Sequence, residues 1–244
     1  ERQFLQALSH PGFPAAGPWR MPLPKLFYLD LKAFAEPIRL TLYVGHVPFE
    51  DVRLSREEIK RMAWEGTLPF GQVPALELSG KMFAQTESLL RWAGRQTNLY
   101  PEDPTLQLFV DEIQDTQVDI RRALLPAWGS SVLHRSPTTK EQLVELPPAM
   151  LEEVIHHLNT TILPVRFGQL ERLLGQAGGP YFCGEQMMVC DISIYVLIEG
   201  ILDGTYAEFV DPRVLDKCPK LKALAEHVGK HPRIAEWNAS HPGP

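Results

Sequence analysis

The chain has 244 residues, of which 44% are hydrophobic and 22% charged, as in an ordinary globular protein. Its formal net charge of −6 argues against the basic surface that nucleic-acid-binding proteins need. No stretch approaches about 18 consecutive apolar residues, so no membrane span is expected. The three cysteines form no CxxC pair, which favours a reducing, cytoplasmic location over a secreted disulfide scaffold.

Residues 1–21 are expected to form a flexible N-terminal arm. Pro11, Gly12, Pro14 and Gly17 disfavour a helix, and the segment lacks the apolar run of a signal peptide. We therefore expect the first 20 residues to be dispensable for folding and activity.

Residues 22–97 have the pattern of a small open sheet with helices. Glu36 and Pro37 suit the first turn of a helix, and Ser79-Gly80 is typical of a hairpin turn. Strands are expected at 25–29, 49–54, 73–78 and 81–84, and helices at 35–45, 55–64 and 86–96.

Residues 98–104 are interpreted as a linker, after which residues 105–244 have a helical pattern. Apolar residues at helical spacing predict a helix over 105–125 that ends at Pro126. Further helices are expected within 140–175, with breaks at Pro147-Pro148 and Pro164, and at 190–203, 213–229 and 232–239.

Three segments together resemble one known family. The residues KLFYLDLKAFAEPIRL (25–40), TLPFGQVPALELSGKMFAQTESLLRW (67–92) and FVDEIQDTQVDI (109–120) are similar to the cytosolic glutathione transferases of the tyrosine type, with the sigma class nearest. Each motif is weak alone, but their order and spacing extend the resemblance over nearly all of residues 22–240. It implies an α/β thioredoxin-like glutathione-binding domain over 22–97 and an all-α domain over 105–244 that carries a hydrophobic electrophile site.

The resemblance implies that Tyr28 is the catalytic residue, since it ends the first strand. A free thiol with a pKa of about 8.5 is only about 3% ionised at pH 7. A hydrogen bond from a neutral phenol to the thiolate contributes roughly 1.5–3 kcal/mol, or about 1–2 pKa units. Taken alone, Tyr28 is more typical of a core tyrosine in a half-buried strand.

The resemblance also implies a set of glutathione contacts. The Val73-Pro74 bond is expected to be cis, which turns the Val73 backbone toward the cysteinyl part of the ligand, with Gln72 nearby. Gln85 and Thr86 open a helix whose free N–H groups suit the γ-glutamyl carboxylate. On local chemistry alone, Thr86 is a helix N-cap and Pro74 an ordinary strand start.

Three aspartates line one face of the helix over 105–125. Asp111, Asp115 and Asp119 recur every four residues, and a solvated face with Asp119 offset by Arg122 is the simplest interpretation. In similar enzymes an aspartate at the Asp119 position reaches the glutamyl amino group across a homodimer. We assign that role to Asp119 and leave the other two undecided.

The remaining site residues rest on weaker patterns. The segment over 55–66 is about two residues longer than its sigma-class counterpart, so the resemblance does not fix which Trp and Lys hold the glycyl carboxylate. Lys60, Arg61 and Trp64 are the candidates. The electrophile pocket is expected to include Leu29, Phe34, Leu124, Trp128, Ser193 and Leu197, although such residues also occur as plain core.

Two departures from the family leave room for a member of low activity. Phe34 stands where many tyrosine-type enzymes have an arginine near the thiolate, and Met188 replaces the usual capping Ser or Thr three residues before Asp191. A metal site is not expected, because His227 and His231 lack a third ligand.

The sequence therefore predicts a glutathione transferase that uses glutathione as co-substrate for a hydrophobic electrophile. The alternatives are a glutathione-dependent isomerase of the sigma type, or a binding or structural protein that retained the fold and lost catalytic activity.

Overall fold

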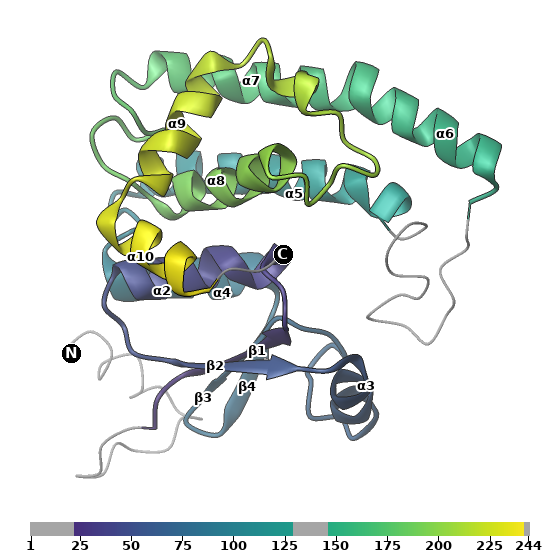
Figure 1. Cartoon of the computed structure of the whole chain (residues 1–244). Helices are drawn as coiled ribbons and strands as arrows, with labels where there is room; N and C mark the ends of the chain where they lie inside the picture. The colour runs from purple at the N-terminus through teal and green to yellow at the C-terminus, as the bar shows by residue number, and fades with distance from the viewer. Residues whose placement is uncertain (1–21, 129–145, 242–244) are drawn as a thin grey trace.

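The computed structural model describes residues 22–128 and 146–241. The expected arm at 1–21 and the start of the expected helical segment at 140–145 lie outside these residues. A small sheet with three helices forms the N-terminal half, and the described residues from Pro104 onward form a helical half stacked on it (Figure 1). The predicted combination of an α/β half and an all-helical half is confirmed.

The sheet contains β1 (Lys25–Leu29), β2 (Glu50–Leu54), β3 (Ala75–Leu78) and β4 (Lys81–Ala84). Their order is β2-β1-β3-β4, with β1 parallel to β2 and the other pairs antiparallel. All four strands were predicted, although β3 begins two residues later than expected. Phe27 lies opposite Ala75, and Ala75 lies opposite Ala84, so these three residues form one row across the sheet.

Helices cover both faces of the sheet. A 3-10 turn (Ala33–Ala35) leads into α2 (Glu36–Val44), and α2 packs against α4 (Thr86–Thr97) between the sheet and the helical half (Figure 1). On the other side, α3 (Arg56–Trp64) packs through Ile59 against Leu54, Leu68 and Ala75. Ser55 and Glu58 form the reciprocal hydrogen bonds of a capping box at the start of α3.

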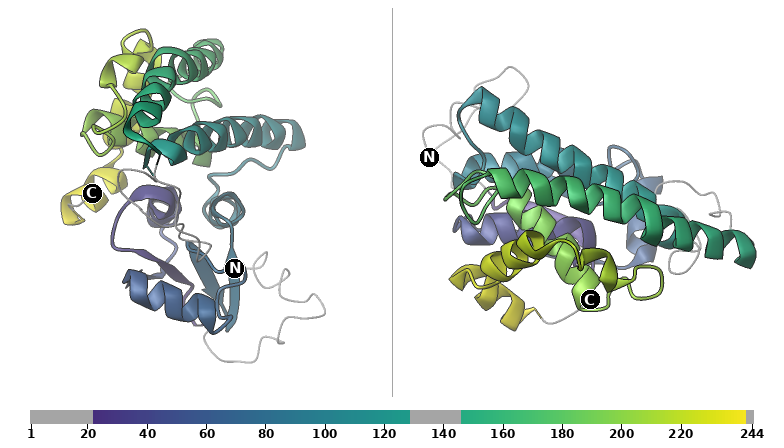
Figure 2. Two further views of the ribbon diagram at one scale, coloured as in Figure 1. Left: turned by 90° about the vertical axis from the view of Figure 1, so that its right-hand side faces the viewer. Right: turned by 90° about the horizontal axis from the view of Figure 1, so that it is seen from above.

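The helical half is built on the long helix α5 (Pro104–Trp128), as Figure 2 shows from two further directions. The predicted end at Pro126 is wrong, because the helix continues to Trp128 with Pro126 inside it. A proline in the last turn removes only one backbone hydrogen bond, so it does not stop the helix there.

Prolines explain the breaks between the later helices. Pro148 and Pro164 lie in the first turns of α6 and α7, as expected, and Pro219 divides the single helix predicted over 213–229 into a 3-10 turn and α9. The remaining elements are α6 (Pro148–His157), a π turn (Leu158–Ile162), α7 (Leu163–Gln176), α8 (Val189–Leu202), a 3-10 turn (Pro212–Leu215), α9 (Pro219–Gly229) and α10 (Pro232–Ser240).

Polar contacts tie the two halves together. Trp237 of α10 donates its Nε1–H to Glu36 of α2 at 2.8 Å. Arg121 of α5 forms an ion pair with Glu87 of α4 at 3.1 Å. These contacts, together with the packing of α8 against α2 and α5, hold the helical half against the sheet half.

Candidate functional site

The strand register assembles the site at one edge of the sheet. Because Phe27, Ala75 and Ala84 form one row across antiparallel neighbours, the next residues at that edge are Tyr28, Pro74 and Gln85. These three were predicted from separate motifs up to 57 positions apart in the numbering. The sheet brings all three motifs to the same place.

Tyr28 carries a hydroxyl group with an unused hydrogen. The side chain is 4% exposed, and burial raises the pKa of its phenol to about 12, so the hydroxyl remains protonated. The N–H of Phe34 donates a long hydrogen bond of 3.4 Å to Tyr28 Oη. Within the described residues the Tyr28 hydroxyl has no acceptor, so it remains able to donate to an anionic sulfur.

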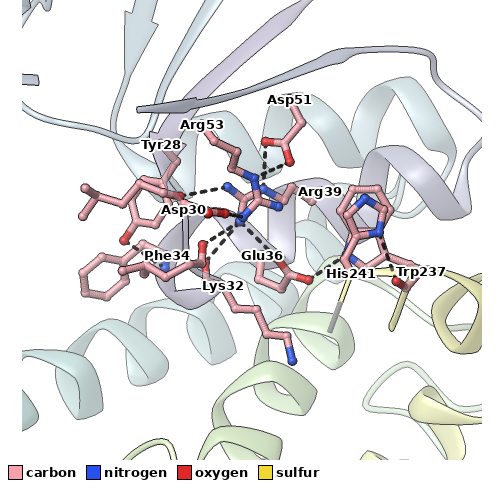
Figure 3. Close-up of polar contacts among 12 residues, drawn as sticks. Tyr28, Asp30, Lys32, Phe34, Glu36, Arg39, Asp51, Arg53, Trp237 and His241 are labelled. Carbon is pink, nitrogen blue, oxygen red and sulfur yellow. Dashed lines mark hydrogen bonds and ion pairs between the residues drawn. The ribbon is translucent and has the colours of Figure 1, made fainter. Parts of the chain in front are cut away.

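A buried arginine holds the loop that follows Tyr28 (Figure 3). Arg39 is fully buried, and its guanidinium donates to the carbonyls of Leu29 at 3.5 Å, Leu31 at 2.9 Å and Lys32 at 3.4 Å. Its charge is balanced by Glu36 at 3.1 Å and by an aspartate, Asp51, at 3.0 Å. Sequence reasoning missed this residue, although an Arg three residues after Glu36 in one helix was a readable signal.

The Val73-Pro74 peptide bond is cis, as predicted. Val73 precedes β3 and is half-buried, and among the described residues no backbone hydrogen bond is made by its N–H or C=O. Paired donor and acceptor groups of this kind suit an extended peptide lying along the sheet edge.

Helix α4 begins at Thr86, as predicted, but Thr86 is not its N-cap. The structure makes Thr86 the first helical residue, and Gln85 occupies the N-cap position without a side-chain capping bond. Gln85 has a φ of +80°, which is uncommon for a residue other than glycine. The N–H groups of the first turn therefore have no intrahelical acceptor, and they suit a carboxylate.

An apolar pocket lies beside the Tyr28 loop, between the two halves. The structure brings four of the six predicted pocket residues together around it, namely Phe34, Leu124, Trp128 and Leu197. Phe34 and Trp128 are in ring contact at 5.7 Å. The lining also includes Ala33, Gln117, Arg121, Val196 and Tyr206, which sequence reasoning missed.

The other two predicted pocket residues lie elsewhere. Ser193 is fully buried behind the pocket, where its hydroxyl donates to Gln117 Oε1 at 2.7 Å. Leu29 lies outside the pocket lining and packs with the α3 side of the sheet. Ser193 lies on α8, which also carries the lining residue Leu197, and Leu29 lies on β1. The direction of a side chain changes with each residue along a strand or helix, so neither of the two side chains lines the pocket.

Gln117 and Arg121 form the polar base of the pocket. Arg121 donates from Nη2 to Gln117 Oε1 at 2.8 Å and to Ser193 Oγ at 3.5 Å. Its Nη1 donates to Glu87 at 3.1 Å. The interruption of the apolar pattern of α5 at Gln117, one turn from Ile113 and from Arg121, was the available sequence signal.

Asp111, Asp115 and Asp119 have different surroundings. Asp111 forms an ion pair with Arg91 at 3.5 Å and accepts a hydrogen bond from the Tyr100 hydroxyl at 3.0 Å, so it connects α5 to α4 and the linker. Asp115 is exposed. Asp119 pairs with Arg122 at 3.8 Å, as expected, and also with a distant arginine, Arg166, at 3.2 Å.

The candidates on α3 are all exposed. Lys60 pairs with Glu57 at 3.7 Å, and Arg61 and Trp64 also lie on the solvent side of this helix. Their assignment to the glycyl carboxylate stays a prediction. No cluster of three potential metal ligands is found in the part of the chain that the structure describes.

Comparison with known proteins identifies the family. Residues 147–241 match the model for the glutathione S-transferase C-terminal domain. Glutathione S-transferase 1 of Ascaris suum is 32% identical over 222 residues, which cover 91% of this chain and 98% of that protein. The chain belongs to the glutathione S-transferase family.

Solved structures of the family share the whole architecture. The prostaglandin synthase D of Nilaparvata lugens has a TM-score of 0.75 and 26% identity, and covers 91% of this chain and 100% of its own. A glutathione S-transferase of Necator americanus, described as monomeric, has a TM-score of 0.74 and 25% identity, and covers 91% and 99%. The thioredoxin-like and helical arrangement predicted for this transferase is therefore that of its family.

No described helix of this transferase combines the length and apolar character of a membrane span.

Proposed function

We propose that this chain conjugates the thiolate of glutathione to hydrophobic electrophiles. The observation that carries the proposal is the buried, protonated Tyr28 hydroxyl with an unused hydrogen, at the same sheet edge as the Val73 backbone and the start of α4. Membership of the glutathione S-transferase family supports glutathione as the co-substrate.

Each part of glutathione has a matching group in this arrangement. The α4 N–H groups and Thr86 suit the γ-glutamyl carboxylate, and the Val73 N–H and C=O suit the cysteinyl backbone, with Gln72 and Gln85 beside them. Tyr28 donates to the sulfur, and the pocket next to Phe34 holds the electrophile. Holding both reactants together replaces a bimolecular encounter, which supplies part of the rate.

The test combines binding and turnover on the full chain. We expect retention on immobilised glutathione and formation of a thioether product from glutathione and a generic aryl halide, monitored by mass spectrometry. Retention without product would support a binding or structural protein in place of a transferase, and absence of retention would contradict the glutathione site itself.

The second candidate function is a glutathione-dependent isomerisation. It is favoured by one observation, the similarity to the prostaglandin synthase D of Nilaparvata lugens over 91% of this chain. An isomerase returns glutathione unchanged, whereas conjugation consumes one glutathione for each product. Measuring free glutathione against product therefore distinguishes the two reactions.

We also propose that the working form is a symmetric homodimer in the cytoplasm, with detoxification of electrophiles as its role. Exposed apolar side chains at Phe70 and Leu108 support an interface, because they are 58% and 71% exposed in the single chain. Asp119 is half exposed, so a ligand in a second copy could approach it in competition with Arg166. The three cysteines are free, as a reducing compartment requires.

Sedimentation at micromolar concentration should give about twice 27.6 kDa. A monomer with full activity would contradict both the dimer and the cross-subunit role of Asp119.

A further inference from the structure

A cation on α5 lies close to the Tyr28 hydroxyl. The N–H of Phe34 donates to Tyr28 Oη at 3.4 Å, and Cζ of Arg121 lies 5.2 Å from the centroid of the Phe34 ring. Phe34 and Arg121 both line the pocket beside the Tyr28 loop. One residue, Phe34, therefore contacts both the hydroxyl and the guanidinium.

The charge of Arg121 acts on the Tyr28 phenol. Burial dominates the pKa of Tyr28 and raises it to about 12, whereas the Phe34 N–H and the charges of Arg39 and Arg121 lower it. A positive charge favours the anionic form of an acid near it. A charge that acts on this phenol also acts on an anionic sulfur that accepts a hydrogen bond from the Tyr28 hydroxyl.

Arg121 has more donors than the protein uses. A guanidinium carries five N–H bonds. One Nη1 hydrogen is taken by Glu87, and two Nη2 hydrogens are taken by Gln117 and Ser193. The Nε–H and the second Nη1 hydrogen have no acceptor among the described residues. Buried donors are normally satisfied, so these two are available to a ligand.

Three helices fix the guanidinium in place, through Glu87 of α4, Gln117 of α5 and Ser193 of α8. The Glu87 carboxylate is itself held by Gln114, which donates to it at 3.0 Å. Arg121 lines the pocket and Glu87 does not, so an anion on the pocket side lies nearer to the guanidinium than to the carboxylate. Because Coulomb energy falls with distance, such an anion gains more from Arg121 than it loses to Glu87.

We propose that Arg121 is a further catalytic residue for conjugation, which donates to the thiolate of bound glutathione and stabilises it together with Tyr28. The inference rests on the proposed function and adds a residue to that same site. Tyr28 donates its hydrogen from β1, and Arg121 supplies a positive charge and two N–H donors from α5, over the ring of Phe34. Fixed donors of this kind stabilise an anion without having to reorganise.

The step is an ionisation and needs no further reactant. The S–H bond of glutathione breaks, its electron pair stays on sulfur, and the proton passes to water. With an aryl halide as electrophile, the sulfur–carbon bond then forms and the halide ion leaves with the electron pair of its bond to carbon.

The test measures the thiol pKa of glutathione bound to the full chain, from the ultraviolet absorbance of the thiolate. Arg121→Met alone would leave the Glu87 carboxylate buried without its partner, so Glu87→Gln is the reference and Arg121→Met is added to it. We expect the bound thiol pKa to be about 1 unit or more higher in the double variant than in Glu87→Gln. Turnover below the thiol pKa should fall about tenfold, and the difference should disappear at a pH above both thiol pKa values.

Arg91→Met in the Glu87→Gln background is the matched control. It removes a cation of α4 that pairs with Asp111 at 3.5 Å and lies outside the pocket lining. The thiol pKa should stay within about 0.3 units of the background value, because salt screens a more distant charge. Arg121→Gln in the same background removes the charge and keeps a hydrogen-bonding side chain, so it gives the same comparison if the methionine variant does not fold.

Equal thiol pKa values in Glu87→Gln and in the Arg121 variants made on it overturn the role of Arg121 and leave the proposed function intact. A shift of the same size in Arg91→Met also overturns it, because the effect would then come from the overall charge of the chain. A parent protein that binds no glutathione, or that leaves the pKa of the bound thiol near the free value of about 8.5, overturns the proposed function itself.

Discussion

Arg39 is fully buried and Arg121 keeps 13% of its side chain exposed, and the two arginines lie in different surroundings. Beneath the loop after β1, Arg39 donates from all three nitrogens, and two carboxylates and three backbone carbonyls receive these bonds. At the base of the pocket, Arg121 has one carboxylate, one amide and one hydroxyl as acceptors, and two of its N–H bonds have none within the described chain.

This difference separates a structural arginine from one that can serve a ligand. All the partners of Arg39 belong to the first 51 residues, so the cluster is complete without any substrate. Arg121 connects α4, α5 and α8, and still presents donors to a pocket. Changes near Arg39 should therefore affect stability most, whereas changes near Arg121 should affect the ionisation of bound glutathione most.

The largest expected effect is on stability, in Arg39→Met. This change leaves the Glu36 carboxylate, 2% exposed, without its cation, and breaking a buried pair from one side costs about 3–5 kcal/mol. Urea unfolding monitored by circular dichroism measures the free energy of unfolding. Arg121→Met combined with Glu87→Gln should lose clearly less, because neither charge is left without its partner, and an equal loss would contradict the comparison.

Another buried ionisable group, Asp191, has no cation as a partner in the described chain. It accepts backbone N–H bonds from Phe182 at 2.9 Å and Met188 at 2.7 Å, yet burial dominates and raises its pKa to about 7. Unfolded aspartate has a pKa of about 3.9. Between these values the folded protein holds a proton that the unfolded chain has released, so stability falls as pH rises from about 4 to 7.

Asp191→Asn keeps an acceptor oxygen and cannot ionise. Between pH 5 and 7, the parent should lose about 2 kcal/mol more of its unfolding free energy than the variant does. Equal pH dependence in the two proteins would show that this carboxylate is not the cause.

Tyr28→Phe tests whether the Tyr28 hydroxyl activates the sulfur of glutathione. It should raise the thiol pKa of bound glutathione by about 1–2 units and lower turnover of the aryl halide near neutral pH about 10- to 100-fold. The loss should shrink as pH rises past the shifted pKa, because thiolate then forms unaided. Thiolate absorbance of the bound ligand and a pH–rate profile provide the measurement, and wild-type turnover and thiol pKa at about pH 6.5 would mean that another group activates the sulfur.

The smallest effect is expected for Ser193→Ala. The hydroxyl donates to Gln117 at 2.7 Å, but Gln117 keeps its own bond to the Ser193 carbonyl, also at 2.7 Å. We expect a loss of about 1 kcal/mol in the free energy of unfolding, typical of one neutral hydrogen bond. A loss as large as that of Arg39→Met would show that the Ser193–Gln117 contact contributes as much to the free energy of unfolding as Arg39 does.

Sequence reasoning was most successful for features encoded within a few residues. All four strands, the first turn of α2 at Glu36 and Pro37, and the cis bond at Pro74 follow from local motifs or from the family resemblance. It was wrong at Pro126, which lies inside α5, and in the interpretation of Thr86 as an N-cap, because Gln85 occupies that position and Thr86 is the first helical residue.

The sequence by itself determined the order of elements and the three motifs that end as Tyr28, Pro74 and Gln85, because turn chemistry and apolar periodicity are local properties. The tertiary structure alone decided which polar side chains share the pocket. Arg121 meets Glu87 from 34 positions away and Ser193 from 72, and Tyr206 joins them from a segment after α8. Such encounters depend on how α4, α5 and α8 pack, and packing directions are set by the assembled core rather than by any short stretch of the chain.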